Sequence, residues 1–313
     1  MKILFVVHRY APYPGGSEYY VANMAEEMLR RGHNVYVLAP TNKGDHNGVK
    51  VLDDFYSLAE KWDLIIVHGG DVQAQNIVHV NAEKILSPVL YLIVKPSDSP
   101  VCVHGLHHHN YLGYSTTMDV DHIKKHGELE KARRVRHGII PHKYYRANLS
   151  EKKIFVSAGG FYPHKAMGPL AQAFTEAKIP NAELHLYGYG EEHLMPSEND
   201  VVKCFFGKTK TDVLFAISEA DAYIMNSYEE GFGLVLLESM MNRTPWYARA
   251  IAGAKDMCYY GTTYNDEKEL MELLRNHTRN EEKIEDAYNY VMSNHTIKHT
   301  CNDIEDILME SKQ

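Results

Sequence analysis

The stretch NSYEEGFGLVLLESMM, residues 226–241, decides the fold of the second half of the chain. Just before it, DAYIM reads as a strand, and within it a loop with two glycines leads into an apolar run typical of a helix. Glu238 lies inside that apolar run, where a carboxylate costs free energy unless something pairs with it. In open α/β sheets, ligands bind at the carboxyl ends of the strands. The stretch therefore predicts a strand–loop–helix unit that holds a ligand.

The loop and the helix indicate the chemistry of this ligand. A helix N-terminus presents unpaired N–H groups and the positive end of a dipole, which favour an anion. Gly231 and Gly233 let the backbone approach a phosphate closely because they have no Cβ. Glu230 and Glu238 are suited to accept hydrogen bonds from sugar hydroxyls. The predicted guest is a diphosphate joined to hydroxylated groups, although two glutamates eight apart also occur by chance in acidic chains.

Strand and helix signals alternate along the chain in two series. The first begins with the strand ILFVV, a helical pattern that ends at Gly32, and the strand NVYVLAP, which together predict a βαβ unit. The second begins with IFVSAGG, after the polar segment 147–153. We therefore expect an α/β chain with two doubly wound, Rossmann-like domains, 1–148 and 149–295, and a ligand site in the cleft between them. Residues 296–313 are expected to form a last amphipathic helix.

Composition limits the function classes. With 44% hydrophobic and 24% charged residues, the 313-residue chain is an ordinary globular protein, and its net charge of −8 argues against a uniformly basic nucleic-acid binder. The four cysteines are widely spread, so they predict neither a zinc site nor a disulfide framework. No G-x-G-x-x-G turn follows the first strand, as a dehydrogenase would need. The apolar runs are too short for a membrane span and the start does not resemble a signal peptide, so we expect a cytoplasmic protein.

Several segments resemble one enzyme family. EEGFGLVLLESMMNRTP, from residue 229, looks like the E-x7-E signature of retaining glycosyltransferases with the GT-B fold, the large family-4 group. SAGGFYPHKA resembles the strand and loop with the family's phosphate-binding lysine, LYGYGEE resembles the turn near the nucleotide base, and FFGKTKTDVLFAISEADAYIMNS resembles the segment before the signature. These motifs keep the family's order over most of residues 154–275, with a weaker match at YPGGSE within the first 40 residues.

The resemblance implies a GT-B enzyme whose last helix crosses back to the first domain. Such an enzyme moves a hexosyl or pentosyl group from a nucleotide-diphosphate sugar to a hydroxyl, with retention at the anomeric carbon. It uses no cofactor and no catalytic metal, because cationic side chains and helix dipoles offset the charge of the leaving diphosphate. The acceptor would be a glycan, a lipid or a small molecule, and the nucleotide, the sugar and the oligomeric state stay open.

Carried over position by position, the resemblance assigns a catalytic role to Glu230, which would hold sugar hydroxyls. The expected donor-binding residues are those that would face the phosphates, base and ribose: Gly15, Gly16, Lys165, Tyr189, Phe232, Gly233, Leu234 and Glu238. Family members also have an active-site histidine after a strand of the first domain. The candidates here for that catalytic position are Lys95, His68 and His104.

The chain departs from the family's pattern at three positions. Gly160 stands where an arginine is usual in the lysine loop, so Arg9 or Lys95 would have to substitute as a phosphate cation. Ala166 replaces a glycine in the same loop. Arg243 stands at another common glycine position, which puts the turn after the signature helix in question.

A basic segment bears on the acceptor. Residues 122–146 contain eight Lys or Arg against two acids, which indicates either a surface for phosphates or a solvated face with pairs such as Glu128 with Lys131. The short N-terminal domain is also similar to those of phage and viral glycosyltransferases, some of which act on hydroxymethylated DNA bases. One alternative function is therefore the transfer of a sugar to hydroxymethylated viral DNA in a host cytoplasm. The other is the binding of a nucleotide sugar by a catalytically impaired protein of the same fold. The histidines 107–109 are expected in a loop rather than at a metal.

Overall fold

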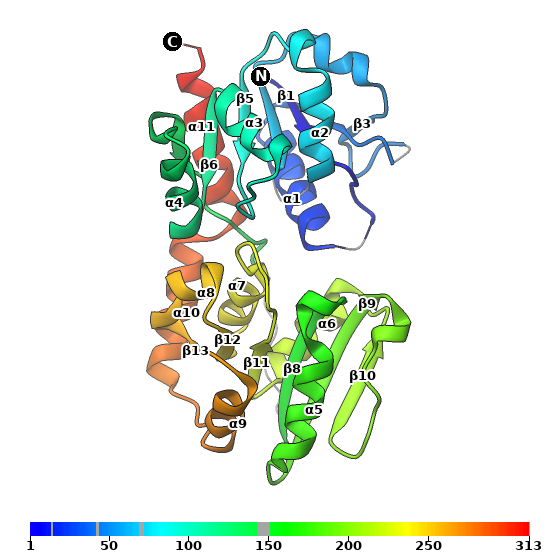
Figure 1. The fold of residues 1–313 in the computed structure, drawn as a ribbon, viewed down its shortest axis with the longest axis vertical. Helices are drawn as coiled ribbons and strands as arrows, with labels where there is room; N and C mark the ends of the chain where they lie inside the picture. The colour runs from blue at the N-terminus through cyan, green and yellow to red at the C-terminus, as the bar shows by residue number, and fades with distance from the viewer. Residues whose placement is uncertain (14, 42–43, 69–71, 143–150, 313) are drawn as a thin grey trace. The chain divides into compact units, whose positions relative to one another are not determined.

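The computed structural model describes residues 1–13, 15–41, 44–68, 72–142 and 151–312. The chain divides into two compact units, Met1–Ile140 with Asn294–Gln313 (unit 1) and Pro141–Ser293 (unit 2), whose helices and strands are labelled in Figure 1. Each unit contains one parallel sheet with helices packed on it, so the expectation of an α/β chain with two doubly wound sheets is confirmed. The expected domain boundary at residue 148 lies outside the described residues.

The sheet of unit 1 has seven strands in the order β3-β2-β1-β4-β5-β6-β7, and every neighbouring pair is parallel. The chain winds outward from β1 in one direction and from β4 in the other, so the switch point of the sheet lies between these two strands. The bounds are β1 (Lys2–Val6), β2 (Asn34–Leu38), β3 (Lys50–Leu52), β4 (Leu64–His68), β5 (Val89–Leu92), β6 (Tyr111–Tyr114) and β7 (Ala132–Arg134). Both β4 and β5 are buried along their whole length, as strands covered on both faces are.

The helices of unit 1 are α1 (Gly16–Arg30), α2 (Val72–Val80), α3 (Pro100–His108), α4 (Thr117–Lys125) and α11 (Ile297–Glu310), with short 3-10 helices at Phe55–Ala59, Ala82–Lys84 and Leu129–Lys131. The helix predicted after the first strand is confirmed, since α1 buries Tyr20, Met24 and Met28 at helical spacing. It ends just before Gly32, whose φ of 88° is left-handed.

The last helix of the chain, α11, belongs to unit 1, where it packs on α1 (Figure 1). Arg31 Nη1 donates to Glu305 Oε2 of α11 at 2.6 Å. Arg136 donates to Asp303 Oδ2 of α11 twice, from its backbone N–H at 2.8 Å and from Nε at 2.9 Å. Residues from opposite ends of the chain therefore share one compact unit.

Unit 2 has a six-stranded, wholly parallel sheet in the order β10-β9-β8-β11-β12-β13, with its switch point between β8 and β11. The strands are β8 (Lys153–Phe161), β9 (Ala182–Gly190), β10 (Val202–Phe206), β11 (Ala222–Met225), β12 (Trp246–Arg249) and β13 (Thr262–Tyr264). The helices are α5 (Met167–Ala177), α6 (Lys210–Glu219), α7 (Leu234–Met241), α8 (Ala252–Asp256), α9 (Glu267–Arg275) and α10 (Glu281–Asn294), with 3-10 turns at Pro163–Lys165, Glu192–Leu194 and Cys258–Tyr260. Within the described parts of both units, no helix has the length and apolarity that crossing a membrane requires.

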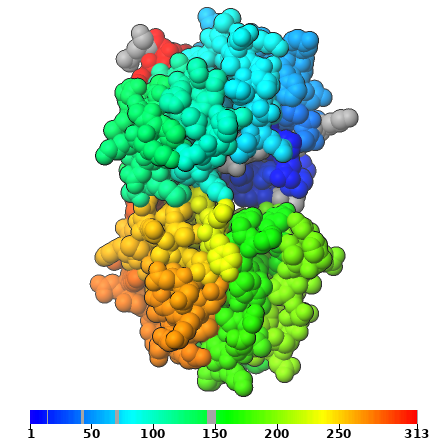
Figure 2. All heavy atoms as spheres, viewed as in Figure 1, coloured from blue at the N-terminus to red at the C-terminus, as the bar shows by residue number. Residues whose placement is uncertain are grey.

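One apolar core joins the two halves of unit 2. Side chains from both halves form a single cluster, among them Phe155, Phe174, Ile224 and Leu270. On the face drawn in Figure 2, the green atoms of the first half lie directly beside the yellow and orange atoms of the second. Burying each such side chain contributes about 1.5–3 kcal/mol relative to leaving it exposed, so this core fixes β8 against β11.

Two of the three departures from the family's pattern coincide with left-handed backbone. Ala166 has φ 50° and Arg243 has φ 54°, where glycine is unstrained and a Cβ is not. The turn after α7 is nevertheless formed, because the Arg243 N–H donates to Met240 O at 3.0 Å. The next N–H, of Thr244, donates to Ser239 O at 3.0 Å, which completes a Schellman motif.

Arg243→Gly is expected to be more stable than Arg243→Ala by about 1 kcal/mol, because only glycine relieves the left-handed strain. Both variants lose the same contacts, namely two hydrogen bonds to Glu285 and the stacking of the guanidinium on Tyr288 at 3.5 Å. Urea unfolding of the two variants measures the difference. Equal stabilities would mean that this turn holds no strain.

Unit 1 contains histidines whose burial keeps them neutral. Burial lowers the pKa of His109 and of His137 to about 3 and that of His295 to about 4. Their side chains are among the buried polar groups of the unit. In the unfolded chain a histidine has a pKa of about 6.5, so unfolding raises the proton affinity of all three.

Unit 1 is therefore expected to lose stability as the pH falls from about 6.5 to about 5, where the unfolded chain binds protons that the folded unit does not. Each histidine contributes a loss of up to about 1.4 kcal/mol per pH unit. Urea unfolding followed by circular dichroism at neutral pH and near pH 5 checks this. His109→Gln is expected to reduce the pH dependence, and a midpoint that does not change with pH would contradict the expectation.

The expectation of a loop at the histidine run is wrong. His107 and His108 form the last turn of α3, and His109 is its C-cap residue. The sequence does not predict α3 because this helix is short and lacks a clear apolar stripe. In the structure, Ser99 caps its start by accepting a hydrogen bond from the Cys102 N–H.

Ion pairs neutralise much of the basic segment in its described part. Lys131 pairs with Glu128 at 2.6 Å, which is the pair predicted if the segment is a solvated face. Three further cations of the segment pair with acids elsewhere in unit 1, namely Lys125 with Asp98, Arg133 with Glu310 and Arg136 with Asp303. Lys143 and Arg146 lie outside the described residues.

Candidate functional site

The switch point of unit 2 brings together two loops that are far apart in the sequence. One follows β8 and contains the turn Pro163–Lys165, and the other, residues 226–233, follows β11. Because β8 and β11 are parallel neighbours, their carboxyl ends lie side by side. The Tyr228 N–H donates to His164 O at 2.8 Å, which joins the two loops directly.

Lys165 and Glu230 form an ion pair across these loops. The lysine donates to Oε1 of Glu230, and Ser227 Oγ donates to the same oxygen at 2.9 Å. The two side chains of the pair are 23% and 16% exposed, so a small ligand can reach them from solvent. The fold thus brings together an ammonium group and a carboxylate that the sequence proposed separately for phosphate and for sugar hydroxyls.

Glu238 lies in α7, buried among apolar side chains and 7% exposed. Lys210 Nζ lies 2.5 Å from its Oε1. Its other oxygen, Oε2, is buried and accepts no hydrogen bond from the described residues. Since buried polar atoms almost always have a partner, this oxygen indicates a hydrogen-bond donor that the described chain does not supply.

Lys210 is a site residue that the sequence reasoning missed. It is the first residue of α6, and a capping box between Thr209 and Asp212 fixes that helix start. The available signal was its position, since it follows β10 at the carboxyl edge of the same parallel sheet. A lysine at such an edge is a candidate partner for any buried acid of the site.

The helix α7 begins directly after Gly233, whose φ of 89° is left-handed. No side chain caps this helix and its first turn contains no acid, so the positive end of its dipole faces no charge of its own. The backbone expected to face phosphate, that of Phe232, Gly233 and Leu234, forms this uncapped start. Phe232 is 4% exposed, which anchors the end of the loop in the core.

A hydrogen-bond network behind the loop 226–233 fixes its position. Asn226 Nδ2 donates to Ala166 O and to Glu267 Oε1, both at 3.0 Å. Arg249 Nε donates to Asn226 O at 3.1 Å, and its guanidinium pairs with Glu267. Burial opposes ionisation of Glu267, but hydrogen bonds from Arg249 and Asn226 hold its pKa below the usual range. The network ties the loop after β11 to the loop after β8.

The ring of Tyr162 covers Gly160, the position at which the family's pattern has an arginine. A Cβ on Gly160 would lie 2.3 Å from Cε2 of Tyr162. That ring stacks on His164 and meets Tyr189 edge-on, with ring centroids 6.4 Å apart. Tyr189, near the end of β9, therefore lies at the same carboxyl edge as Lys165.

Three of the residues proposed in unit 1, namely Gly15, Gly16 and His68, lie at the switch point of that sheet. Gly15 and Gly16 begin α1, after β1, and a Cβ on Gly16 would meet no other atom. A Cβ on Gly15 would lie 2.1 Å from Oε2 of Glu18, whose side chain covers it. His68 ends β4, the parallel neighbour of β1, and is 3% exposed, with its ring centroid 6.1 Å from that of Tyr20.

The other candidates for the family's histidine lie elsewhere in unit 1. Lys95 is exposed in the loop after β5. His104 lies within α3, where burial and the neighbouring His108 and His79 lower its pKa. Arg9, offered as a substitute phosphate cation, follows β1, and its Nε lies 3.5 Å from Oε1 of Glu18, the side chain that covers Gly15. Of the candidates for the family's histidine, His68 is the one at the switch point.

Lys210→Met is expected to destabilise unit 2, because it leaves the buried carboxylate of Glu238 without a cation. Adding Glu238→Gln is expected to recover part of the loss, with a coupling energy of about 1 kcal/mol, since Lys210 is partly exposed. Urea unfolding of the two single variants and the double variant gives this coupling. Lys208→Met, a change of an exposed neighbour, is the control. Strictly additive effects would show that the pair contributes nothing.

Comparison with protein families finds one match. Residues 145–293, nearly the whole of unit 2, match the family model described as Glycosyl transferases group 1. No curated protein matches the chain in sequence.

Solved structures of similar fold cover the whole chain. HepE of Anabaena, in complex with UDP and glucose, has a TM-score of 0.80 at 16% identity, covering 99% of this chain and 100% of its own. Sucrose-phosphate synthase of Thermosynechococcus elongatus has a TM-score of 0.78 at 15% identity, with 98% of each chain covered. WaaG, a glycosyltransferase involved in lipopolysaccharide biosynthesis, has a TM-score of 0.72 at 18% identity, covering 98% of this chain and 99% of its own. At such identities the likeness establishes the fold, which is GT-B.

Proposed function

We propose that this chain, whose residues 145–293 match the family model described as Glycosyl transferases group 1, moves a sugar from a nucleoside-diphosphate sugar to a hydroxyl acceptor. The observation that supports this most is the buried Oε2 of Glu238, which accepts no hydrogen bond from the described residues. A ribose hydroxyl of the donor would satisfy it, and leaving such an atom unsatisfied costs about 1–3 kcal/mol. Lys210, on the other oxygen, holds the carboxylate in place.

In the proposed complex, Lys165 and the start of α7 bind the diphosphate. The lysine already faces the loop after β11 through its pair with Glu230. A phosphate arriving there would share the ammonium group and would also meet the uncapped helix start. Glu230 would then accept hydrogen bonds from hydroxyls of the sugar, whose anomeric carbon is next to the leaving phosphate.

We further propose that the transfer retains the anomeric configuration and needs no metal for its chemistry. The proposal of retention rests on the resemblance of residues 229–245 to the E-x7-E signature of retaining glycosyltransferases, in which Glu230 and Glu238 are the two acids. The proposal that no metal is needed rests on Lys165 and the dipole of α7, which would offset the charge of the leaving diphosphate. Turnover that is unchanged by added Mg²⁺ or Mn²⁺, and a product whose anomeric configuration matches the donor's, are the expected results.

One observation favours a second candidate function. Gly160 stands where the family's pattern has an arginine, and the ring of Tyr162 covers it, so the chain offers no cation at this position. A chain with one phosphate cation fewer would bind nucleotide sugars yet transfer slowly or not at all. The paired cations of the basic segment give no argument for a DNA acceptor, although modified DNA belongs among the acceptors tested.

The test begins with calorimetric binding of UDP-, GDP-, ADP- and CMP-sugars, followed by release of free nucleotide with and without acceptors. UDP-glucose comes first because HepE, of similar fold, was obtained with UDP and glucose. One preferred donor that is also turned over supports a transferase. Binding without turnover favours the second candidate, and binding of no donor contradicts both.

Glu230→Gln is expected to lower kcat at least about 100-fold while donor binding persists, because a neutral amide holds the hydroxyls less strongly as charge develops. Glu238→Gln is expected chiefly to weaken nucleotide binding. Glu229→Gln is the matched control, since it makes the same change at an adjacent exposed residue. Unchanged turnover in Glu230→Gln would refute the role given to this residue.

A further inference from the structure

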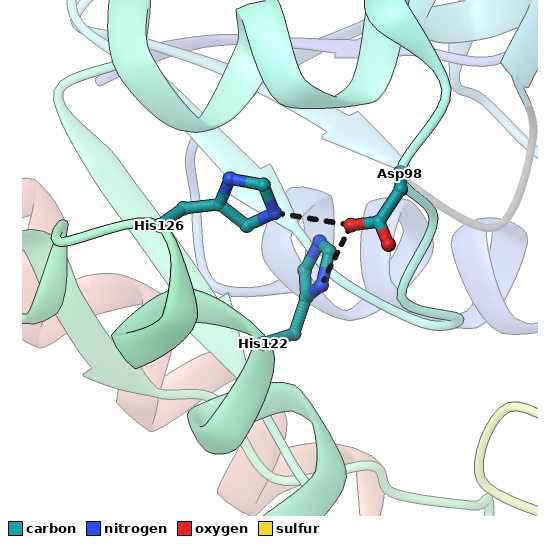
Figure 3. A group of neighbouring side chains, drawn as sticks. All are labelled: Asp98, His122 and His126. Carbon is teal, nitrogen blue, oxygen red and sulfur yellow. Dashed lines mark hydrogen bonds and ion pairs between the residues drawn. The ribbon is translucent and has the colours of Figure 1, made fainter.

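Two imidazoles and one carboxylate converge in unit 1, and the proposed transfer uses none of them. Asp98 lies in the loop between β5 and α3, His122 in the last turns of α4, and His126 at the C-cap of that helix. Figure 3 shows both rings directed at the same carboxylate oxygen. We propose that these three side chains form a binding site for one Zn²⁺ ion.

The geometry of the three side chains carries the proposal. His126 Nε2 lies 3.1 Å and His122 Nδ1 3.8 Å from Oδ1 of Asp98. All three ligand atoms lie within 4.8 Å of one another. The two histidines are four residues apart, so successive turns of α4 place them on one face. Ligands spaced one helical turn apart can bind a single ion.

The donor set suits zinc. Zn²⁺ is held by imidazole nitrogens and carboxylate oxygens at about 2.0–2.2 Å, usually with tetrahedral geometry. Ligand atoms around such an ion lie about 3.3 Å apart, so those of Asp98 and the two histidines, which lie within 4.8 Å of one another, need to close by about 1.5 Å or less. Asp98 is on a loop with a side chain 61% exposed, whereas His122 is 9% exposed. The carboxylate and the ring of His126, which is 17% exposed, can therefore move toward the His122 nitrogen that packing already fixes, and water fills the fourth position.

Lys125 and the two histidines contact different oxygens of the Asp98 carboxylate. The Lys125 Nζ lies 2.6 Å from Oδ2 of Asp98, while the imidazoles face Oδ1. Hydrogen bonds from Lys125 and His126 hold the pKa of Asp98 at about 2, which keeps it ionised as a ligand. The lysine also competes with a cation for the same carboxylate, so its removal should strengthen metal binding. If these residues formed only a structural ion pair, removal of Lys125 would loosen the group and would not strengthen metal binding.

A second group of histidines in unit 1 lacks this geometry. His104 and His108 stack, with ring centroids 4.0 Å apart and an interplanar angle of 29°, and His79 meets His104 edge-on at 4.2 Å. Stacked rings present faces to each other instead of pointing their nitrogens at one ion. This group provides the control for any binding that depends only on having many histidines.

The ion would join two elements that are otherwise held by hydrogen bonds. It would fix the loop after β5, which contains Lys95, to the end of α4. Because a metal that binds only the folded chain stabilises it, unit 1 should become more resistant to unfolding as the Zn²⁺ concentration rises. This role is separate from transfer chemistry, and its test does not depend on activity.

The experiment uses the full chain, treated with chelator and then freed of it, and titrates ZnCl₂ by calorimetry. One ion per chain is expected to bind, and Asp98→Asn and His122→Gln are each expected to weaken binding at least about tenfold. Lys125→Met is expected to tighten it. Co²⁺ in place of Zn²⁺ supplies a second readout, a visible spectrum of tetrahedral type that disappears in His126→Gln, a change at a partly exposed position.

His104→Gln and His108→Gln are the matched controls and should leave the affinity unchanged. Loss of binding in these controls, with retention in the Asp98 and His122 variants, would overturn the proposal. So would the absence of binding to the unaltered chain, or an affinity that falls in Lys125→Met. If His122→Gln does not fold, the Asp98 and Lys125 variants, both altered at exposed side chains, still decide the question.

Discussion

The ion pair between Lys165 and Glu230 is the contact on which the site of unit 2 depends. Its partners are 65 residues apart and meet because β8 and β11 are neighbours at the switch point of the sheet. Partial exposure matters here, since a fully buried pair would resist the approach of a phosphate and a fully exposed one would be weakly held. The pair holds both groups close to where a donor would need them.

Two other cations at this edge of the sheet are also held in position by acids. Lys210 is held by Glu238, and Arg249 by Glu267. On a chain of net charge −8, each cation is oriented by an acid before any ligand arrives. Of the three acids Glu230, Glu238 and Glu267, Glu238 is the one whose second oxygen is both buried and without a hydrogen bond from the described chain. Orientation in advance lowers the entropic cost of ordering long side chains when a ligand binds.

The two substituted glycine positions show how local strain is tolerated. Ala166 keeps a left-handed backbone, and the side-chain amide of Asn226 donates to its carbonyl. Arg243 keeps the same conformation at the end of α7, where its guanidinium pairs with Glu285 and stacks on Tyr288. In both places, contacts in the folded chain offset the strain of a left-handed backbone, which glycine would not have. The backbone path of the family's pattern is therefore kept although its residues are not.

The sequence by itself determined the α/β class, the two series of strands, and the strand–loop–helix unit that contains Glu230 and Glu238, because these features follow from local periodicity and turn residues. The sequence did not predict shorter elements such as α3, since a nine-residue helix without an apolar stripe gives little periodic signal. Only the tertiary structure decided that Lys210 partners Glu238 and that Asp98 meets His122 and His126. These pairings depend on which strand ends lie next to each other and on how a helix packs, and no local pattern encodes contacts between residues so far apart in the chain.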